Sequence, residues 1–113
     1  MNLVTTDWLK TNLNKVKIFD ATWHMPNLKR DARKEYLAKH IPGAIFWDLD
    51  EHSDKSSPYP HMLPSSDYWA QMLWSFGIKN DDHVITYDFS DVHSACRLWF
   101  SLKYFGHQKV SVL

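Results

Sequence analysis

The single cysteine of the chain, Cys96, is the first candidate for nucleophilic chemistry. Arg97 follows it directly, and a neighbouring guanidinium can stabilise a thiolate. Cys96 lies near the start of an apolar helical pattern that extends over residues 94–105. A free cysteine in such a helix is more often a small buried side chain than a reactive one. We therefore interpret Cys96 as a buried, inert thiol.

Seven histidines supply side chains that can carry a proton near neutral pH. No two of them have the His-x-x-x-His spacing of a zinc site, and one cysteine would add only a single ligand, so we predict no metal site. His61 lies in a long polar segment, residues 48–64, with prolines at 58, 60 and 64. Long loops of this kind are often functional. Taken alone, a histidine in such a loop is expected to bond to the backbone.

Charge and glycine content exclude two other classes of function. Thirteen basic and thirteen acidic residues give a formal net charge of zero, and no run of like charges predicts binding to nucleic acid. The three glycines, at 43, 77 and 106, are too widely spaced for a phosphate-binding loop. We expect no cofactor and no nucleic-acid partner.

Length and composition predict a soluble domain with a substantial core. The chain has 113 residues, 44% of them hydrophobic and 15% aromatic. One cysteine excludes an internal disulfide bond and fits a reducing compartment. No signal peptide, transit peptide or membrane span is visible, so we expect a cytoplasmic protein with no membrane partner.

Helices and strands alternate along the chain and must position these side chains. The clearest junction is residues 36–46, where Pro42 and Gly43 interrupt a helix and an apolar run follows, and we expect His40 to hold this turn. Helices are predicted from about residue 5 and over 30–39, 65–77 and 94–105, and strands over 16–19, 44–46, 83–87 and 110–113. This alternation predicts an α/β fold with a mainly parallel sheet. The helix over 94–105 is apolar nearly all round, so it should be covered on more than one side.

The last predicted strand is still apolar at Leu113, with no helix to cover it. We therefore expect one domain over residues 1–113 that is truncated at its C-terminus and is a fragment of a longer protein.

Several short motifs occur in one collinear order. The junction contains Tyr36 and then His40-Ile41-Pro42-Gly43-Ala44. Around it stand Asp20-Ala21-Thr22-Trp23, Arg30-Asp31-Ala32-Arg33, Ser57-Pro58-Tyr59, His61-Met62-Leu63-Pro64 and Phe105-Gly106-His107. Together they resemble the rhodanese superfamily, specifically the N-terminal half of two-domain thiosulfate and 3-mercaptopyruvate sulfurtransferases. The resemblance implies a three-layer α/β domain, with a mainly parallel central sheet flanked by helices.

The resemblance also implies that the catalytic cysteine lies in a C-terminal domain outside residues 1–113. In this family that cysteine takes sulfane sulfur as a persulfide and passes it to a thiol or cyanide. The matching position here holds Asp88, and a carboxylate cannot carry sulfur, while Cys96 lies well past that position. We therefore expect the chain to be the non-catalytic half of a transferase and to be inactive alone. Its expected partners are the C-terminal rhodanese domain, a small sulfur donor and the acceptor.

The supporting site residues are likewise implied by the resemblance. In 3-mercaptopyruvate sulfurtransferases, the histidine matching His61 is proposed to pair with an aspartate, here Asp50, in a relay with a serine of the C-terminal domain. Trp23 matches an aromatic residue at the mouth of the substrate pocket. His93 stands where relatives carry Phe or Tyr against the substrate, and whether it also walls the pocket stays open. Arg97 matches an arginine that we interpret as structural.

A second hypothesis places the chain in another functional class. It would be a free-standing, non-catalytic rhodanese-like module that binds or regulates a partner protein. The two hypotheses differ in whether a second domain with a Cys-x-x-Gly-x-Thr-like loop follows residue 113.

Overall fold

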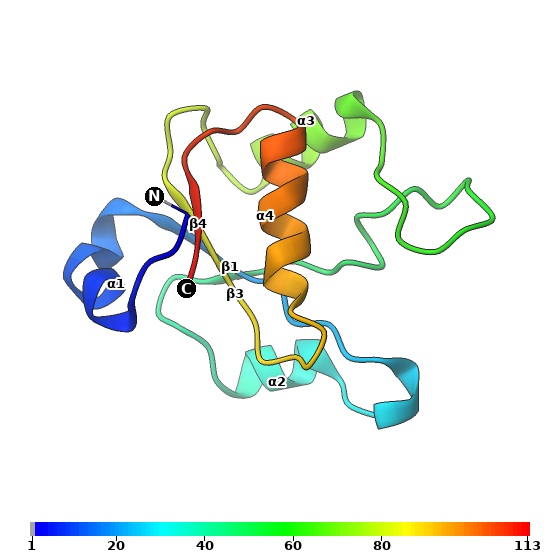
Figure 1. Cartoon of the computed structure of the whole chain (residues 1–113), viewed down its shortest axis with the longest axis horizontal. Coiled ribbons are helices and arrows are strands. Elements are labelled where there is room, and N and C mark those ends of the chain that lie inside the picture. The colour runs from blue at the N-terminus through cyan, green and yellow to red at the C-terminus, as the bar shows by residue number, and fades with distance from the viewer. Residues whose placement is uncertain (1) are drawn as a thin grey trace.

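A four-stranded parallel sheet forms the centre of the computed structural model, which describes residues 2–113 (Figure 1). Its strands β1 (Lys17–Asp20), β2 (Ile45–Phe46), β3 (Val84–Tyr87) and β4 (Val110–Val112) lie in the order β2-β1-β3-β4. The helices are α1 (Thr6–Asn12), α2 (Ala32–Ala38), α3 (Ser66–Ser75) and α4 (Ser94–Tyr104), with 3-10 turns η1 (Leu13–Lys15) and η2 (Pro26–Leu28). The predicted α/β class with a parallel sheet is confirmed.

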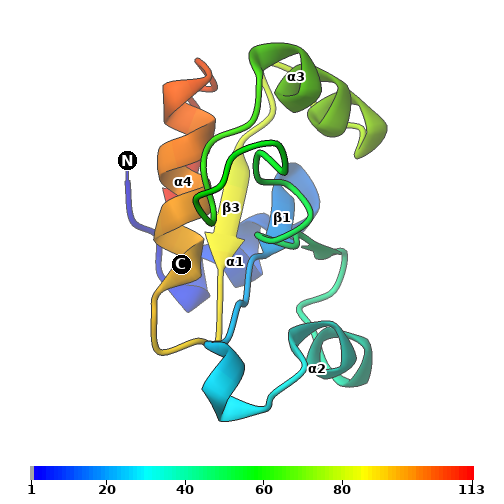
Figure 2. The ribbon, with the colours of Figure 1, turned by 90° about the vertical axis from the view of Figure 1, so that its right-hand side faces the viewer.

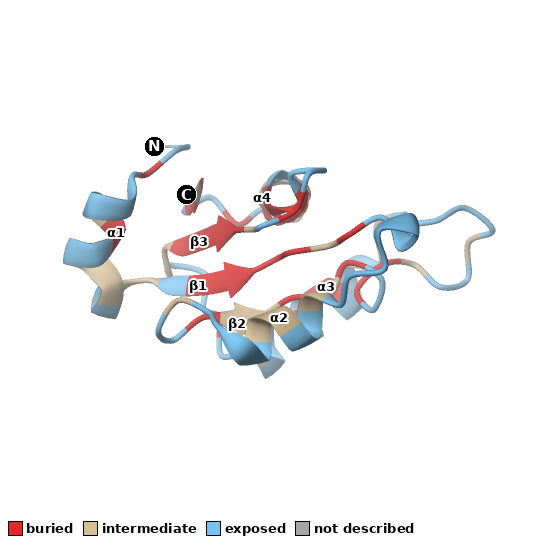
Figure 3. Cartoon of the chain, turned by 90° about the horizontal axis from the view of Figure 1, so that it is seen from below, coloured by how far each residue is buried: buried red, intermediate tan, exposed pale blue. Residues whose placement is uncertain are grey.

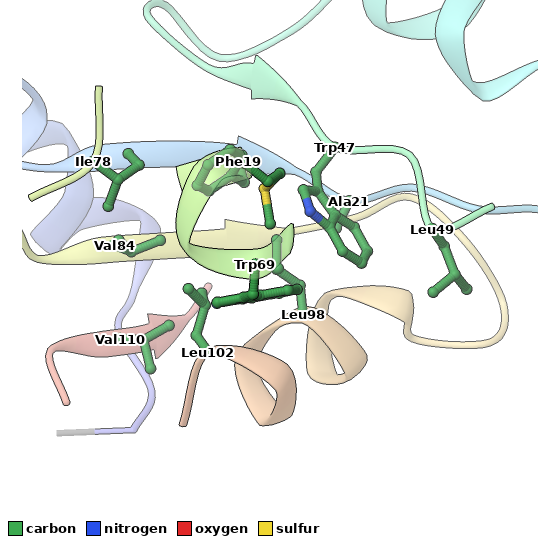
Figure 4. Close-up of a cluster of buried hydrophobic side chains, with 11 residues drawn as sticks. Phe19, Ala21, Trp47, Leu49, Trp69, Ile78, Val84, Leu98, Leu102 and Val110 are labelled. Carbon is green, nitrogen blue, oxygen red and sulfur yellow. The ribbon is translucent and has the colours of Figure 1, made fainter. Parts of the chain in front are cut away.

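Helices cover the sheet on both faces, which gives the three layers that were predicted. Phe19 of β1 faces a cluster formed with α3 and α4, in which Trp69 lies close to Leu98 and Leu102 (Figure 4). Its neighbour Ile18 faces the opposite cluster, where α1 packs through Leu9. Adjacent residues of a strand point to opposite faces, so one short strand contributes to both halves of the core.

The central strand β3 is buried along its whole length, as the red arrow in Figure 3 shows. Its sequence Val84-Ile85-Thr86-Tyr87 lacks the alternation of apolar and polar residues that a half-exposed strand would have. A continuous run is expected where helices cover both faces of a parallel sheet.

The junction at residues 36–46 has the predicted form of a helix, a turn and a strand. His40 donates a hydrogen bond from Nδ1 to the Tyr36 carbonyl, 2.7 Å away, and its ring stacks on the Tyr36 ring with centroids 4.1 Å apart. The Tyr36 hydroxyl donates to the Ala44 carbonyl across the turn. His40 therefore holds the turn, as expected. Leu37, in the helix before this turn, is 71% exposed.

No helix within residues 2–113 is long and apolar enough to cross a membrane. The longest one in that part of the chain, α4, has 11 residues, against the roughly 20 that a bilayer core requires.

Tyr87 makes the stability of the fold sensitive to alkaline pH. Its hydroxyl accepts a hydrogen bond from the Ile41 backbone N–H at 3.2 Å, and burial raises the pKa of Tyr87 from 10.0 to about 12. Below pH 10 Tyr87 keeps its hydroxyl proton in both the folded and the unfolded chain, so the free energy of unfolding is not reduced. Above that pH the unfolded chain ionises first, so about 3 kcal/mol should be lost in total as the pH rises from 10 through 12.

We expect Tyr87→Phe to remove most of this alkaline loss, measured by guanidinium unfolding at about pH 9 and about pH 11. Tyr104→Phe is the matched control, because Tyr104 is 63% exposed. An equal alkaline loss in wild type and Tyr87→Phe would contradict the assignment.

Candidate functional site

Three strands end side by side at one edge of the sheet. Asp20, the last residue of β1, is in register with Phe46 at the end of β2 and with Tyr87 at the end of β3. The loops that follow these strands therefore begin at the same edge, and Figure 2 shows the chain leaving β1 and β3 there. In open parallel sheets, ligands bind outside the carboxyl ends of the strands. All sequence-predicted site residues lie in or next to these three loops.

The loop after β1 is fixed by a buried carboxylate. Asp20 is 2% exposed, and its Oδ1 accepts hydrogen bonds from the backbone N–H and the hydroxyl of Thr22, at 3.0 and 2.6 Å. The Thr22 hydroxyl oxygen accepts in turn from the backbone N–H of Phe89, at 3.1 Å, in the loop after β3. The next residue, Trp23, is thus delivered to a defined position, and its backbone N–H donates to Ser94 Oγ at 3.1 Å.

A turn after β2 presents Asp50 to solvent. Trp47 and Leu49, which precede it, are buried, at 1% and 6% exposure. Asp48 Oδ1 accepts from the backbone N–H of Asp50 at 2.9 Å, which is the side-chain hydrogen bond of an Asx turn. With the preceding residues buried and its backbone held, the Asp50 side chain is 65% exposed and available for contact.

The structure brings Trp23, Asp50 and His61 into one cluster. His61 Nε2 lies 2.7 Å from Asp50 Oδ1, and the Trp23 indole N–H donates to Asp50 Oδ2 at 3.0 Å. The rings of Trp23 and His61 meet edge to face, with centroids 4.8 Å apart and planes at 84°. Each carboxylate oxygen of Asp50 therefore has its own nitrogen partner.

This arrangement defines which nitrogen of His61 can exchange a proton with a substrate. Because Nε2 faces the carboxylate, the Asp50 contact favours the tautomer that carries its proton on Nε2. Nδ1 is then the basic nitrogen, and within residues 2–113 it has no hydrogen-bond partner. An aspartate–histidine pair of this kind can accept and return a proton when a reacting group approaches Nδ1.

Asp88 has a structural role in the loop after β3. Its Oδ1 accepts from the backbone N–H and the hydroxyl of Ser90, both at 2.9 Å, and its Oδ2 accepts from the Ala95 N–H at 2.7 Å. Ala95 is in the first turn of α4, whose N–H groups need acceptors. The carboxylate therefore both shapes the loop and caps the helix.

His93 and Cys96 lie beside the cluster and do not join it. His93 is exposed in the left-handed backbone region, with φ of 53°, and within residues 2–113 no hydrogen bond or ring contact of its imidazole is present. Cys96 is exposed, so the prediction of a buried thiol was wrong. The buried stripe of α4 includes Ala95, Leu98 and Leu102, and Cys96 projects from the helix outside that stripe.

Two residues of α4 bond to the backbones of the cluster residues, and this role was not predicted from the sequence. Ser94 accepts the Trp23 backbone N–H, as described above, and Arg97 donates from Nη2 to the backbone carbonyl of His61. The sequence singled out Arg97 only as a neighbour of Cys96 and as a structural residue. A contact across 36 residues leaves no local pattern that could reveal it.

A polar cleft of about 390 Å³ lies against Trp23 and Asp50 on the side of α2. Arg30 and Arg33 line it, and both are engaged with acids. Arg30 donates from Nε to Glu35 Oε2 at 2.9 Å. Arg33 Nη2 lies 3.8 Å from Asp48 Oδ2 and 3.7 Å from Glu51 Oε2. No group of histidine, cysteine and acidic side chains that could hold a metal occurs within residues 2–113.

The parallel sheet, the two helical layers and the loops at its carboxyl edge together define a rhodanese-type α/β domain. The chain belongs to the rhodanese-like domain family, whose model matches residues 5–113. The predicted family is confirmed.

The chain is similar to relatives named for 3-mercaptopyruvate and to relatives named for thiosulfate. It is 44% identical to the 3-mercaptopyruvate sulfurtransferase of Rattus norvegicus and 45% identical to the thiosulfate sulfurtransferase of Bos taurus. Each match covers 98% of this chain and 40% of the relative, so the chain spans well under half the length of these proteins. Near-equal identities do not separate the two donors.

Solved structures confirm the fold. SseA from Escherichia coli, a 3-mercaptopyruvate sulfotransferase, superposes with a TM-score of 0.91 at 40% identity, over 98% of this chain and 44% of SseA. Tum1 from Saccharomyces cerevisiae gives a TM-score of 0.88 at 33% identity, over 100% of this chain and 39% of Tum1.

Proposed function

We propose that residues 1–113 are the non-catalytic N-terminal half of a two-domain sulfurtransferase. The observation that carries this proposal is the pair of His61 and Asp50, with its 2.7 Å contact at the carboxyl edge of the sheet. The complete protein would take sulfane sulfur onto a cysteine of its C-terminal domain as a persulfide and transfer it to a thiol or cyanide. The chain's 40% share of its relatives' length supports such a second domain.

In the proposed complex each residue of the cluster has a distinct part. His61 Nδ1 points away from Asp50 and would exchange a proton with the substrate or with a serine of the C-terminal loop. Asp50 holds the imidazole in the required tautomer. Trp23 packs against the ring edge and would line the pocket mouth, with His93 on the neighbouring loop as a further wall.

The proposed donor is 3-mercaptopyruvate, with thiosulfate as the alternative. Release of sulfur from 3-mercaptopyruvate leaves an enolate that must gain a proton, whereas thiosulfate releases sulfite, which leaves as a stable anion. A positioned histidine can supply the proton that the first reaction needs, whereas the second reaction needs none. We also propose a cytoplasmic location, supported by the lone cysteine; because one relative from Arabidopsis thaliana is named mitochondrial, cell fractionation is the test.

Asp88 leads us to propose that this half is inactive alone. Its carboxylate occupies the position of the family nucleophile, and both of its oxygens are engaged in hydrogen bonds with the loop and α4. Cys96 is exposed and could react as an adventitious thiol, so its contribution to any turnover needs a direct measurement.

The proposal is tested by two measurements on the gene and its product. The reading frame should continue past residue 113 into a domain with a Cys-x-x-Gly-x-Thr-like loop. The complete protein should produce pyruvate from 3-mercaptopyruvate, while the 113-residue chain and its Cys96→Ser variant should give the same background rate. A stop codon soon after Leu113 would instead favour the free-standing binding module, and turnover by the short chain that Cys96→Ser abolishes would contradict the inactive assignment.

A further inference from the structure

The backbone of His61 is held in a conformation that few residues adopt unaided. Its φ is 59°, in the left-handed region that few residues other than glycine occupy, although histidine, like asparagine and aspartate, is enriched there. Such a conformation costs on the order of 1 kcal/mol or more, and it persists where surrounding contacts impose it. If those contacts were removed, the backbone would relax and the imidazole would leave Asp50.

The contact at this point comes from Arg97. Its Nη2 donates to the His61 carbonyl, and its Nε donates to Ser101 Oγ at 3.3 Å. The guanidinium is half-buried, and burial lowers the pKa of Arg97, although the group remains protonated at neutral pH. Within residues 2–113 no carboxylate lies within 4.0 Å of it. The carbonyl of His61 is therefore a main acceptor for this charge, and charge-assisted hydrogen bonds are the strong ones.

Arg97 is itself carried by a rigid element. Leu98, the next residue, and Leu102, one turn further on, are completely buried against the sheet. Ser94, one turn before Arg97, accepts the backbone N–H of Trp23. Trp23 and His61 each contact one carboxylate oxygen of Asp50. Helix α4 therefore anchors the backbones of both residues that hold the Asp50 side chain.

We propose that Arg97 is a positioning residue for His61: its guanidinium fixes the His61 backbone so that the imidazole stays on Asp50. Within residues 2–113 Arg97 makes no hydrogen bond to the imidazole, and it is not a catalytic residue. The proposal rests on the proposed function for its effect on turnover, but its structural part stands on the contacts alone. In this proposal a half-buried arginine positions a proton-transfer group that lies 36 residues away in the sequence.

The test uses Arg97→Gln and Arg97→Lys in the complete gene product, each with His61 present and with His61→Gln. With His61 present, Arg97→Gln should lower the turnover of 3-mercaptopyruvate about 10- to 100-fold, as misplacement of a reacting group by about 1 Å does. Arg97→Lys should restore part of it, because an ammonium can still donate one bond to the carbonyl. In the His61→Gln background the same substitution should change turnover by less than about threefold, since there is no imidazole left to position.

A second readout does not depend on activity. In histidine-labelled protein, the NMR signal of the His61 Nε2–H bonded to Asp50 should weaken or shift in Arg97→Gln. Lys103→Ala is the matched control: Lys103 donates to the Gln108 carbonyl at 2.8 Å at the far end of α4, so its loss also removes a cation–carbonyl bond.

The outcomes separate the two proposals. An unchanged His61 signal in Arg97→Gln, or an equal loss of turnover in both His61 backgrounds, would overturn the positioning role. If His61→Gln leaves turnover intact while Arg97→Gln still displaces the His61 signal, the proposed function fails and the positioning role stands. Should Arg97→Gln not fold, the Arg97→Lys pair, compared with and without His61, gives the same two tests.

Discussion

His61→Gln in the complete protein should lower the turnover of 3-mercaptopyruvate by about 10²- to 10⁴-fold, the range that a positioned proton-transfer group contributes. Glutamine can keep a hydrogen bond to Asp50 but cannot accept and return a proton. Thiosulfate turnover should fall by less than about threefold, because sulfite needs no proton to leave. The ratio of the two turnover numbers is therefore the measurement.

Stability should not obscure this result. The side chains of His61 and Asp50 are 27% and 65% exposed, and an exposed ion pair contributes at most about 1 kcal/mol. His40→Gln is the matched control, because His40 bonds only to the backbone and stacks on Tyr36 in a distant turn. Asp50→Asn should give a smaller loss than His61→Gln, since the imidazole remains but its tautomer is no longer imposed. Equal losses with both donors, or no loss with either, would refute the role of His61.

Asp88→Ala should lower the free energy of unfolding of the chain by about 2–4 kcal/mol. The substitution removes an acceptor from the N–H and hydroxyl of Ser90 and from the N–H of Ala95, and these donors lie in a partly buried loop. Loss of a helix cap alone costs about 1 kcal/mol, and the two bonds within the loop add to it. Urea unfolding of the 113-residue chain measures the effect.

Two further variants separate the carboxylate's hydrogen bonds from its charge. Asp88→Asn keeps an oxygen acceptor and should lose less than half as much stability as Asp88→Ala. Asp91→Ala removes an exposed carboxylate from the same loop and should change the unfolding free energy by less than about 0.5 kcal/mol. A loss in Asp88→Ala no larger than that of Asp91→Ala would show that the loop does not depend on this carboxylate.

The elements of the fold were predictable to within one or two residues because they are recorded in local patterns. The strand predicted over residues 16–19 forms at Lys17–Asp20, and the helix predicted over 94–105 forms at Ser94–Tyr104. Apolar runs, N-cap residues and the Pro42-Gly43 interruption act over a few residues, so a sequence displays them directly.

Side-chain environments on α4 were harder to predict. An apolar composition nearly all round the helix indicated cover on more than one side, yet Phe100 and Tyr104 are 50% and 63% exposed. Cys96 shares that outer surface, which is why the buried thiol was a wrong prediction. Composition sets how apolar a helix is, while the sheet decides which of its faces is covered.

The pairing of Asp50 with His61 came from family resemblance, and no local pattern in the sequence indicates it. Its supports, Ser94 and Arg97, act through backbone groups of distant residues. Every residue has a backbone carbonyl, and every residue except proline a backbone N–H, so the side chains at positions 23 and 61 do not indicate these bonds. Only the folded chain reveals them.

The anchoring of three separate loops on the first turns of α4 has a consequence for local unfolding. Trp23, His61 and the Asp88 loop are each tied to Ser94, Ala95 or Arg97. Segments bound to one support tend to open together as a cooperative unit. Fraying of this helix end would release all three loops at once, so the amide hydrogens that this opening exposes would report the same free energy of opening despite their distance in the sequence. The site would then be lost in a single event, and not residue by residue.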